Sequence, residues 1–123
     1  MENKNIVVFG CKKTTRFILD NICEKYNICH IITISPQKNS KVIVPDYYDL
    51  RTFAEDKNIP IYHCNKYSLQ NDDDINFINK LNIDIAFVMG WQRLIPEKIL
   101  DNVKIGVYGM HGSSSNLPKG RGR

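Results

Sequence analysis

The chain has 123 residues, a formal net charge of +4, 42% hydrophobic residues and 24% charged residues. This length fits one domain that buries roughly two thirds of the surface exposed by the unfolded chain. No apolar run reaches the ~18 residues that a membrane span needs, and the N-terminus lacks the apolar region and cleavage site of a signal peptide. The composition argues against a membrane protein and predicts a cytoplasmic location.

The positive charge is concentrated at the C-terminus. Lys119, Arg121 and Arg123 lie among the last five residues, and the rest of the chain is nearly balanced. This distribution favours a phosphate group near the C-terminal loop over the extended basic surface that a nucleic-acid backbone requires.

The four cysteines are scattered and form no CxxC pair. In a reducing compartment, cysteines with such spacing behave as small buried hydrophobic residues, so neither a disulfide nor a metal site is expected. These residues are Cys11, Cys23, Cys29 and Cys64.

The first two predicted elements are a buried strand and an amphipathic helix. Residues 5–10 form a short β-branched apolar run ending in glycine, which is typical of a strand buried on both faces and predicts the central strand of a sheet. Residues 14–26 have helical spacing, with Thr14 or Thr15 as the expected N-cap. The side chains expected to face the core are Phe17, Ile18, Ile22 and Tyr26.

The middle of the chain predicts two strands with a helix between them. Residues 28–35 form the first strand, because Pro36 restricts the residue before it and ends the ladder. The pair Pro45-Asp46 is expected to begin the helix, and residues 59–62 form a short strand whose proline favours an edge or a strand-start position. The apolar stripe of this helix consists of Tyr48, Leu50, Phe53 and Ala54.

Residues 72–108 continue the alternation. Three adjacent aspartates, Asp72 to Asp74, begin a helix, where carboxylates favour the positive end of the dipole. A metal site is not expected there, because neighbouring helical residues point in different directions. Residues 83–89 form a strand, residues 96–100 a short helix begun by proline, and residues 105–108 a fifth strand.

This order predicts an α/β fold. Strands that alternate with helices form a parallel sheet with right-handed crossovers, so the chain should be a single Rossmann-like domain over residues 1–123 with helices on both faces of the sheet.

The turn after the first strand carries one glycine, Gly10, where a dinucleotide fingerprint has three, and it contains no P-loop pattern. Lys12 or Lys13 could meet an anionic substrate group there, because the turn precedes a helix N-terminus. A solvated lysine is the alternative.

The segment after the fourth strand is a candidate binding loop. Its glycine is followed by an aromatic and aliphatic ledge, which can offer backbone groups and apolar surface to a flat heteroaromatic ring. Plain packing of Trp91 is the alternative. The loop consists of Met89, Gly90, Trp91, Gln92, Arg93, Leu94 and Ile95.

A histidine follows the fifth strand. His111 stands three residues past Tyr108 between glycines, where packing requires no imidazole, so it is the candidate catalytic residue. His30 and His63 lie within or at the end of strands without partners at metal-ligand spacing, and we expect them to be structural.

Together these segments resemble the N-terminal domain of the 10-formyltetrahydrofolate-dependent formyltransferases. The first group of matching residues is Ile6 to Gly10, Phe53-Ala54 and Asn58 to Ile61. The second is Ile83-Asp84, Gly90-Trp91, Arg93 to Pro96 and Ile99-Leu100. The last group is His111-x-Ser113, Leu117-Pro118 and Arg121-Gly122.

The resemblance implies that 10-formyltetrahydrofolate is the co-substrate and that an amine attacks its formyl group. His111 would manage protons, the pterin would lie along residues 89–95, and Lys12 and Ser113 would contact the substrate. The family places an oxyanion-stabilising asparagine two residues before the histidine, where this chain has Gly109, and Asn116 could replace it. The family's aspartate that orients the histidine has no counterpart before Arg123.

The sequence therefore predicts a formyltransferase domain that acts on a primary amine and is inactive alone because it is truncated. The expected acceptor is an amino sugar linked to a nucleotide, and methionyl-tRNA is the second candidate. The alternatives are a noncatalytic folate-binding module and an α/β nucleotide-binding protein of another family. The sequence indicates no oligomeric state.

Overall fold

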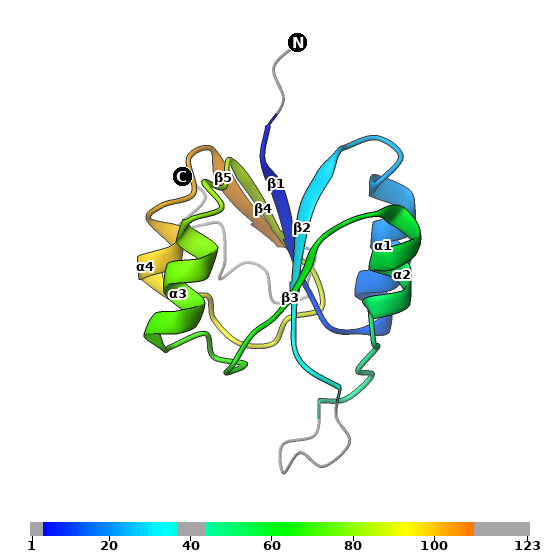
Figure 1. Ribbon diagram of the computed structural model, residues 1–123, viewed down its shortest axis with the longest axis horizontal. Helices are drawn as coiled ribbons and strands as arrows, with labels where there is room; N and C mark the ends of the chain where they lie inside the picture. The colour runs from blue at the N-terminus through cyan, green and yellow to red at the C-terminus, as the bar shows by residue number, and fades with distance from the viewer. Residues whose placement is uncertain (1–3, 37–43, 110–123) are drawn as a thin grey trace.

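The computed structural model describes residues 4–36 and 44–109. Strands and helices alternate throughout these two ranges, as predicted (Figure 1). The strands are β1 (Ile6–Phe9), β2 (Ile28–Thr33), β3 (Ile61–His63), β4 (Ile85–Val88) and β5 (Gly106–Gly109). The helices are α1 (Lys13–Ile22), α2 (Arg51–Lys57), α3 (Asp72–Asn79) and α4 (Glu97–Leu100).

The strands form one parallel sheet in the order β3-β2-β1-β4-β5. β1 is central, as predicted from its uninterrupted apolar sequence, and β3 is an edge strand, as predicted from Pro60. From β1 the chain builds the sheet in one direction to β3, and it then returns to the other side of β1 for β4 and β5. The sheet therefore has a topological switch point between β1 and β4.

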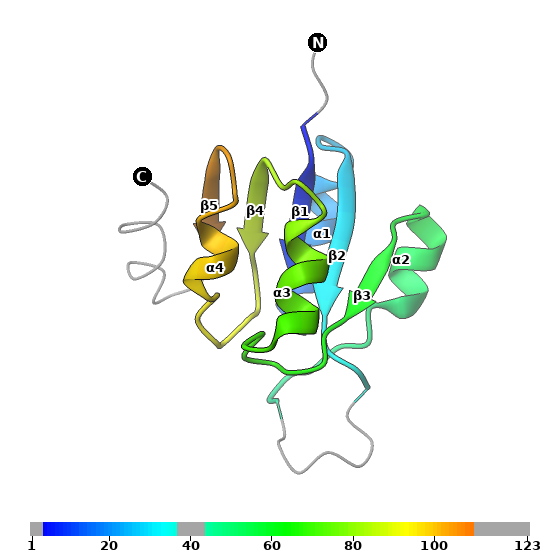
Figure 2. The same cartoon turned by 60° about the vertical axis from the view of Figure 1, so that its left-hand side comes forward.

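Helices cover both faces of the sheet, which confirms the predicted architecture. α1 and α2 lie on one face, and α3 and α4 on the other (Figures 1 and 2). Successive side chains of a strand point to opposite faces. Accordingly, Val7 and Phe9 belong to the apolar cluster beneath α3 and α4, whereas Ile6 and Val8 belong to the cluster beneath α1 and α2. Among the described residues, no helix has the length and apolar character needed to cross a membrane.

The apolar face predicted for the first helix is partly wrong. α1 ends at Ile22, so Tyr26 lies beyond it, and Phe17 is 69% exposed. The side chains that α1 buries are those of Thr15 and Leu19. The N-cap is Lys12, and Thr15 lies in the first turn, where its hydroxyl accepts a hydrogen bond from the Lys12 N–H (3.2 Å). Thr15 is buried in place of Phe17 because its hydroxyl donates to the carbonyl of Met89, a partner that the sequence does not reveal.

The second helix begins five residues later than predicted, at Arg51. The segment before it pairs with the turn after β1 instead of forming a helical turn. Tyr47 makes an isolated antiparallel bridge with Lys12, and the N–H of Tyr48 donates to the carbonyl of Cys11 (2.9 Å). Asp46 has a positive φ of 59°, which is incompatible with a right-handed helix. Long-range hydrogen bonds therefore override the helix-start signal of Pro45-Asp46.

Candidate functional site

The loops that follow β1 and β4 meet at the switch point. The N–H of Met89 donates to the carbonyl of Phe9 (2.9 Å), and the N–H of Cys11 donates to the carbonyl of Gly90 (3.2 Å). In open α/β sheets, ligands bind in the crevice outside the carboxyl ends of the strands at such a point. The structure thus brings together the β1 turn, which holds Lys12, and the beginning of the 89–95 loop.

Two glycines allow this close approach. A Cβ on Gly10 would lie 2.2 Å from the carbonyl oxygen of Met89, and a Cβ on Gly90 would lie 2.4 Å from the hydroxyl of Thr15. Gly90 also has a φ of +74°, which side chains rarely tolerate. The Thr15 hydroxyl donates in turn to the carbonyl of Met89. The contact between the two loops is therefore closely packed.

Lys12 lies directly beside the 89–95 loop. Its Cβ would be 3.1 Å from a Cβ on Gly90, and its side chain is half-buried, whereas Lys13 is exposed. As the N-cap of the ten-residue α1, Lys12 also stands at the positive end of a helix dipole. This position suits the predicted contact with an anionic substrate, and the contact itself stays a prediction.

The 89–95 loop divides into buried and exposed residues. Met89, Trp91 and Ile95 are buried, whereas Gln92, Arg93 and Leu94 are exposed, Leu94 by 73%.

The Trp91 indole, 4% exposed, packs edge-on against Phe9 (6.1 Å between ring centroids) and Tyr67 (4.9 Å). Trp91 therefore supports the loop from behind instead of presenting its face to a ligand.

The exposed tip of the loop is suited to binding a flat polar ring. Within the described ranges, the backbone N–H and C=O groups of Arg93 and Leu94 form no hydrogen bonds with the protein. The N–H of Gln92 is occupied, because it donates to the hydroxyl of Tyr67 (2.8 Å). Free backbone groups beside the exposed Leu94 side chain are the combination that the predicted pterin ledge requires. Binding by residues 89–95 stays a prediction.

The fifth strand ends beside this loop. β4 and β5 pair in register, with Val88 opposite Gly109, so the segments after both strands begin at the same edge of the sheet. His111, Ser113 and Asn116 lie outside the described residues. Gly109 is described and provides no side-chain donor.

The other two histidines have structural surroundings. The His30 ring packs edge-on against Phe77 (5.5 Å), and burial lowers its pKa. Burial also lowers the pKa of His63, and the nearby Arg51 guanidinium lowers it further. Both imidazoles are therefore neutral at pH 7.

The aspartate run begins α3, as predicted, but its members differ. Asp72 and Asp73 are exposed, whereas the Asp74 carboxylate is buried and accepts hydrogen bonds from the Tyr62 hydroxyl (2.7 Å) and the N–H of Asn65 (2.9 Å). Burial acts to raise the pKa of Asp74, but the hydrogen bonds outweigh it and the pKa is lowered. No group of three His, Cys, Asp or Glu side chains within residues 4–36 and 44–109 could hold a metal ion.

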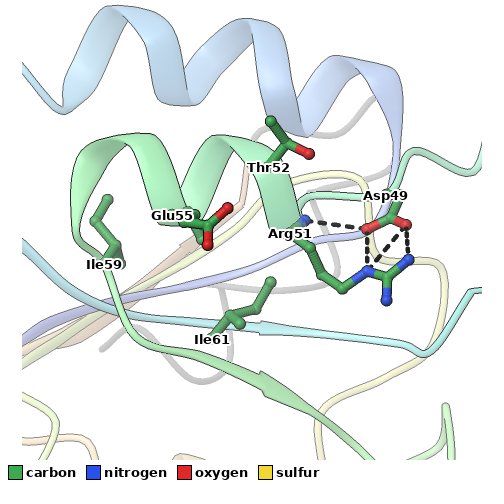
Figure 3. Close-up of a pocket in the computed structure, with 7 residues that line it drawn as sticks. Asp49, Arg51, Thr52, Glu55, Ile59 and Ile61 are labelled. Carbon is green, nitrogen blue, oxygen red and sulfur yellow. Dashed lines mark hydrogen bonds and ion pairs between the residues drawn. The ribbon is translucent and has the colours of Figure 1, made fainter.

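A separate hollow of about 470 Å³ lies between α2 and the edge strand β3 (Figure 3). At its mouth, the Arg51 guanidinium forms a two-pronged ion pair with Asp49, with a shortest distance of 2.7 Å. None of the site residues predicted from the sequence lines it. The full lining is Asp49, Arg51, Thr52, Ala54, Glu55, Ile59 and Ile61.

Sequence reasoning missed two residues of the candidate site. Thr15 was predicted only as a possible N-cap, and Tyr67 lies in a segment with no periodic pattern. Hydrophobic spacing cannot identify either residue, because each acts through a hydroxyl whose partner is distant in sequence.

Comparisons with known proteins find related sequences. The chain is 30% identical to a methionyl-tRNA formyltransferase of Rickettsia canadensis, over 95% of this chain and 37% of the relative. It is 33% identical to one of Dictyoglomus thermophilum, over 95% of this chain and 36% of that relative. The chain is similar to the formyltransferase family. It corresponds to the N-terminal domain of that family and spans just over a third of the length of these relatives.

Solved structures support the fold. The domain superposes on the phosphoribosylglycinamide formyltransferase of Bacillus halodurans with a TM-score of 0.62 and 13% identity, over 88% of this chain and 56% of that one. A glycinamide ribonucleotide transformylase of Symbiobacterium toebii also gives 0.62, with 16% identity, over 89% and 51%. No family model matches the chain.

Proposed function

We propose that this domain binds 10-formyltetrahydrofolate and contributes the general acid/base to formyl transfer onto a primary amine. One observation carries the proposal: β4 and β5 are adjacent parallel strands, with Val88 opposite Gly109. Two residues of chain span at most ~7 Å, so a side chain two positions past a strand end stays near that end. His111 follows Gly109 by two positions, and the 89–95 loop follows Val88.

The proposed reaction is an acyl transfer. The amine nitrogen bonds to the formyl carbon, the bond from that carbon to N10 of the folate breaks, and a proton moves from the amine to N10. His111 would accept and return this proton, as general acids and bases do within hydrogen-bond reach. The pterin would lie along the free backbone groups of Arg93 and Leu94, which would hold the formyl donor at the switch point.

This chain lacks the side chain that stabilises the oxyanion in the family. Gly109 has no side chain at the position where the family carries an asparagine, and losing one such donor costs roughly 10²- to 10³-fold in kcat. Asn116 is the proposed substitute. A domain that binds folate without turnover is the matching second candidate, and Gly109 is the observation that favours it.

There are two hypotheses for the acceptor amine. The names of the relatives favour methionyl-tRNA. The nearly balanced charge outside the C-terminal tail and the unusual Gly109-Met110-His111 sequence favour an amino sugar linked to a nucleotide. Either acceptor would be used by an enzyme of one-carbon metabolism in the cytoplasm. We therefore propose a cytoplasmic location.

Calorimetry with 5-formyltetrahydrofolate, a stable analogue of the donor, tests the folate site. We expect binding to the wild type, and weaker binding to Leu94→Asp, which places a charge on the exposed ledge. Glu97→Gln is the control outside the ledge. No binding at millimolar concentrations would exclude the proposed function.

Transfer assays test the role of His111. Assayed in a chain extended past Arg123, His111→Ala should retain folate binding but lose transfer to both acceptors, whereas His63→Ala, an imidazole at another strand end, should retain both. Turnover near the wild-type rate in His111→Ala would remove the proposed mechanism. Folate binding without turnover both in this chain and in one extended past Arg123 would favour the noncatalytic module.

A further inference from the structure

Tyr67 connects three parts of the candidate site, although it lies in the segment between β3 and α3. Its hydroxyl accepts a hydrogen bond from the N–H of Gln92 (2.8 Å), a residue 25 positions away in the sequence. This bond occupies the one backbone N–H that separates the buried Trp91 from the free backbone groups of Arg93 and Leu94. The hydroxyl therefore contacts the loop where it turns from the core toward solvent.

The ring of Tyr67 contacts the residues on either side of Gln92. The Trp91 indole packs against it with 4.9 Å between ring centroids and an interplanar angle of 71°. The Arg93 guanidinium carbon lies 5.1 Å from the ring centroid, within the range of a cation–π interaction. Three consecutive loop residues thus contact one side chain.

The same hydroxyl faces the turn after β1. The Sγ of Cys11 lies 3.7 Å from the Tyr67 hydroxyl and 3.5 Å from the carbonyl of Gly90, so its single proton can be donated to either oxygen. Burial raises the pKa of Tyr67 and that of Cys11, so both groups are protonated near neutral pH. Tyr67 therefore joins the two loops of the switch point.

Tyr67 is itself held in place by the start of α3. The Asp74 carboxylate accepts hydrogen bonds from the N–H groups of Asn65 (2.9 Å) and Lys66 (3.1 Å), the two residues before Tyr67. The N–H of Leu69 donates to the carbonyl of Lys66 (2.8 Å) and closes a turn around Tyr67. This backbone is anchored independently of the 89–95 loop, so it can serve as a fixed support.

We propose that Tyr67 is a positioning residue whose hydroxyl holds the 89–95 loop in the conformation that binds the folate. The inference rests on the proposed function for its ligand, but the contact between Tyr67 and the loop can be tested without any ligand. Tyr67 does not touch the reacting atoms in this proposal. It fixes the direction in which the backbone groups of Arg93 and Leu94 point.

The test replaces Tyr67 by phenylalanine, which removes the hydroxyl and keeps the ring beside Trp91 and Arg93. Hydrogen exchange at the Gln92 amide should become roughly tenfold faster, because the amide loses its acceptor. Trp91 is the only tryptophan in the chain, so its fluorescence reports directly on the loop, and acrylamide should quench it more strongly. The Kd for 5-formyltetrahydrofolate should rise roughly fivefold.

Tyr62→Phe is the matched control. It also removes a tyrosine hydroxyl from this part of the protein, but that hydroxyl bonds Asp74 and does not contact the loop. The control should lower the midpoint of unfolding while leaving Trp91 quenching and the folate Kd unchanged. In turnover assays on a chain extended past Arg123, Tyr67→Phe should raise the KM for 10-formyltetrahydrofolate with little change in kcat, as expected for lost ground-state binding.

The outcomes separate the two proposals. Gln92 exchange and Trp91 quenching that are unchanged in Tyr67→Phe would overturn the role of Tyr67. A loosened loop together with no folate binding by the wild type would support the role of Tyr67 in holding the loop and overturn the proposed function. Should Tyr67→Phe fail to fold, Gln92→Pro removes the same hydrogen bond from the loop side, and unchanged Trp91 quenching there would also overturn the role of Tyr67.

Discussion

The hydroxyl of Thr15 in α1 donates a hydrogen bond to the carbonyl of Met89 at the end of β4. It also accepts one from the N–H of Lys12 (3.2 Å), so a single buried side chain joins the β1 turn, the helix and the start of the 89–95 loop. Gly10 and Gly90 leave the space that this contact needs. The Thr15 hydroxyl therefore links the two loops of the switch point by hydrogen bonds.

Replacing Thr15 by valine tests how much these hydrogen bonds stabilise the protein. Valine keeps the shape but leaves the buried carbonyl of Met89 without its donor, so we expect a loss of about 1–3 kcal/mol in the free energy of unfolding. Thr15→Ser retains the hydroxyl and should cost less. Urea unfolding of the three proteins measures the difference, and a valine variant as stable as the wild type would contradict the assignment.

Gly90 should not tolerate alanine. A Cβ there would meet the Thr15 hydroxyl at 2.4 Å, and the φ of +74° adds backbone strain, so Gly90→Ala should cost about 2 kcal/mol or more. Gly106→Ala is the control, because its Cβ would meet only the movable Tyr108 ring, at 3.0 Å or more. Thermal unfolding compares the two variants. Equal losses of stability in the two variants would show that a Cβ is tolerated as well at Gly90 as at Gly106 in the edge strand.

Asp74 should make stability depend on pH. Its pKa is lower in the folded protein than the ordinary value of 3.8, so its stabilising effect is complete above that value and is lost as the pH falls through the folded-state pKa. At pH 7, Asp74→Asn should cost about 1–3 kcal/mol, because the amide NH₂ would face the N–H donors of Asn65 or Lys66.

The difference between wild type and Asp74→Asn should shrink as the pH falls below 3.8, because the unfolded chain then binds a proton that the folded Asp74 carboxylate binds only at lower pH. Asp73→Asn, at an exposed position of the same helix, is the control and should lose less stability at pH 7 than Asp74→Asn. Urea unfolding between pH 3 and pH 7 gives the comparison. A constant difference across that range would mean that Asp74 titrates normally.

The buried thiols should be unreactive in the native protein. Burial raises the pKa of Cys64 to about 12 and also raises that of Cys11, so few thiolates form at pH 8. Cys23 and Cys29 are half-exposed. Brief treatment with iodoacetamide, followed by peptide mass spectrometry, should find Cys23 and Cys29 labelled first. Early labelling of Cys11 would indicate that the switch point opens readily.

The sequence alone determined the class of fold, the central position of β1 and the edge position of β3. These features are local, because a strand buried on both faces must be continuously apolar and a proline cannot occupy the interior of a ladder. The sequence also predicted a loop over residues 89–95, since a glycine and an aromatic and aliphatic ledge after a buried strand form a contiguous pattern; its binding role stays a prediction.

Tertiary structure decided which side chains build the site. Phe17 has the spacing of a core residue but is exposed, whereas the polar Thr15 is buried, because its hydroxyl bonds the carbonyl of Met89, a residue more than 70 positions away. Trp91 turned out to pack inward, and Tyr67 became part of the site through Gln92. Hydrophobic periodicity records which residues avoid water, but it carries no information about which distant polar groups will meet once the chain has folded.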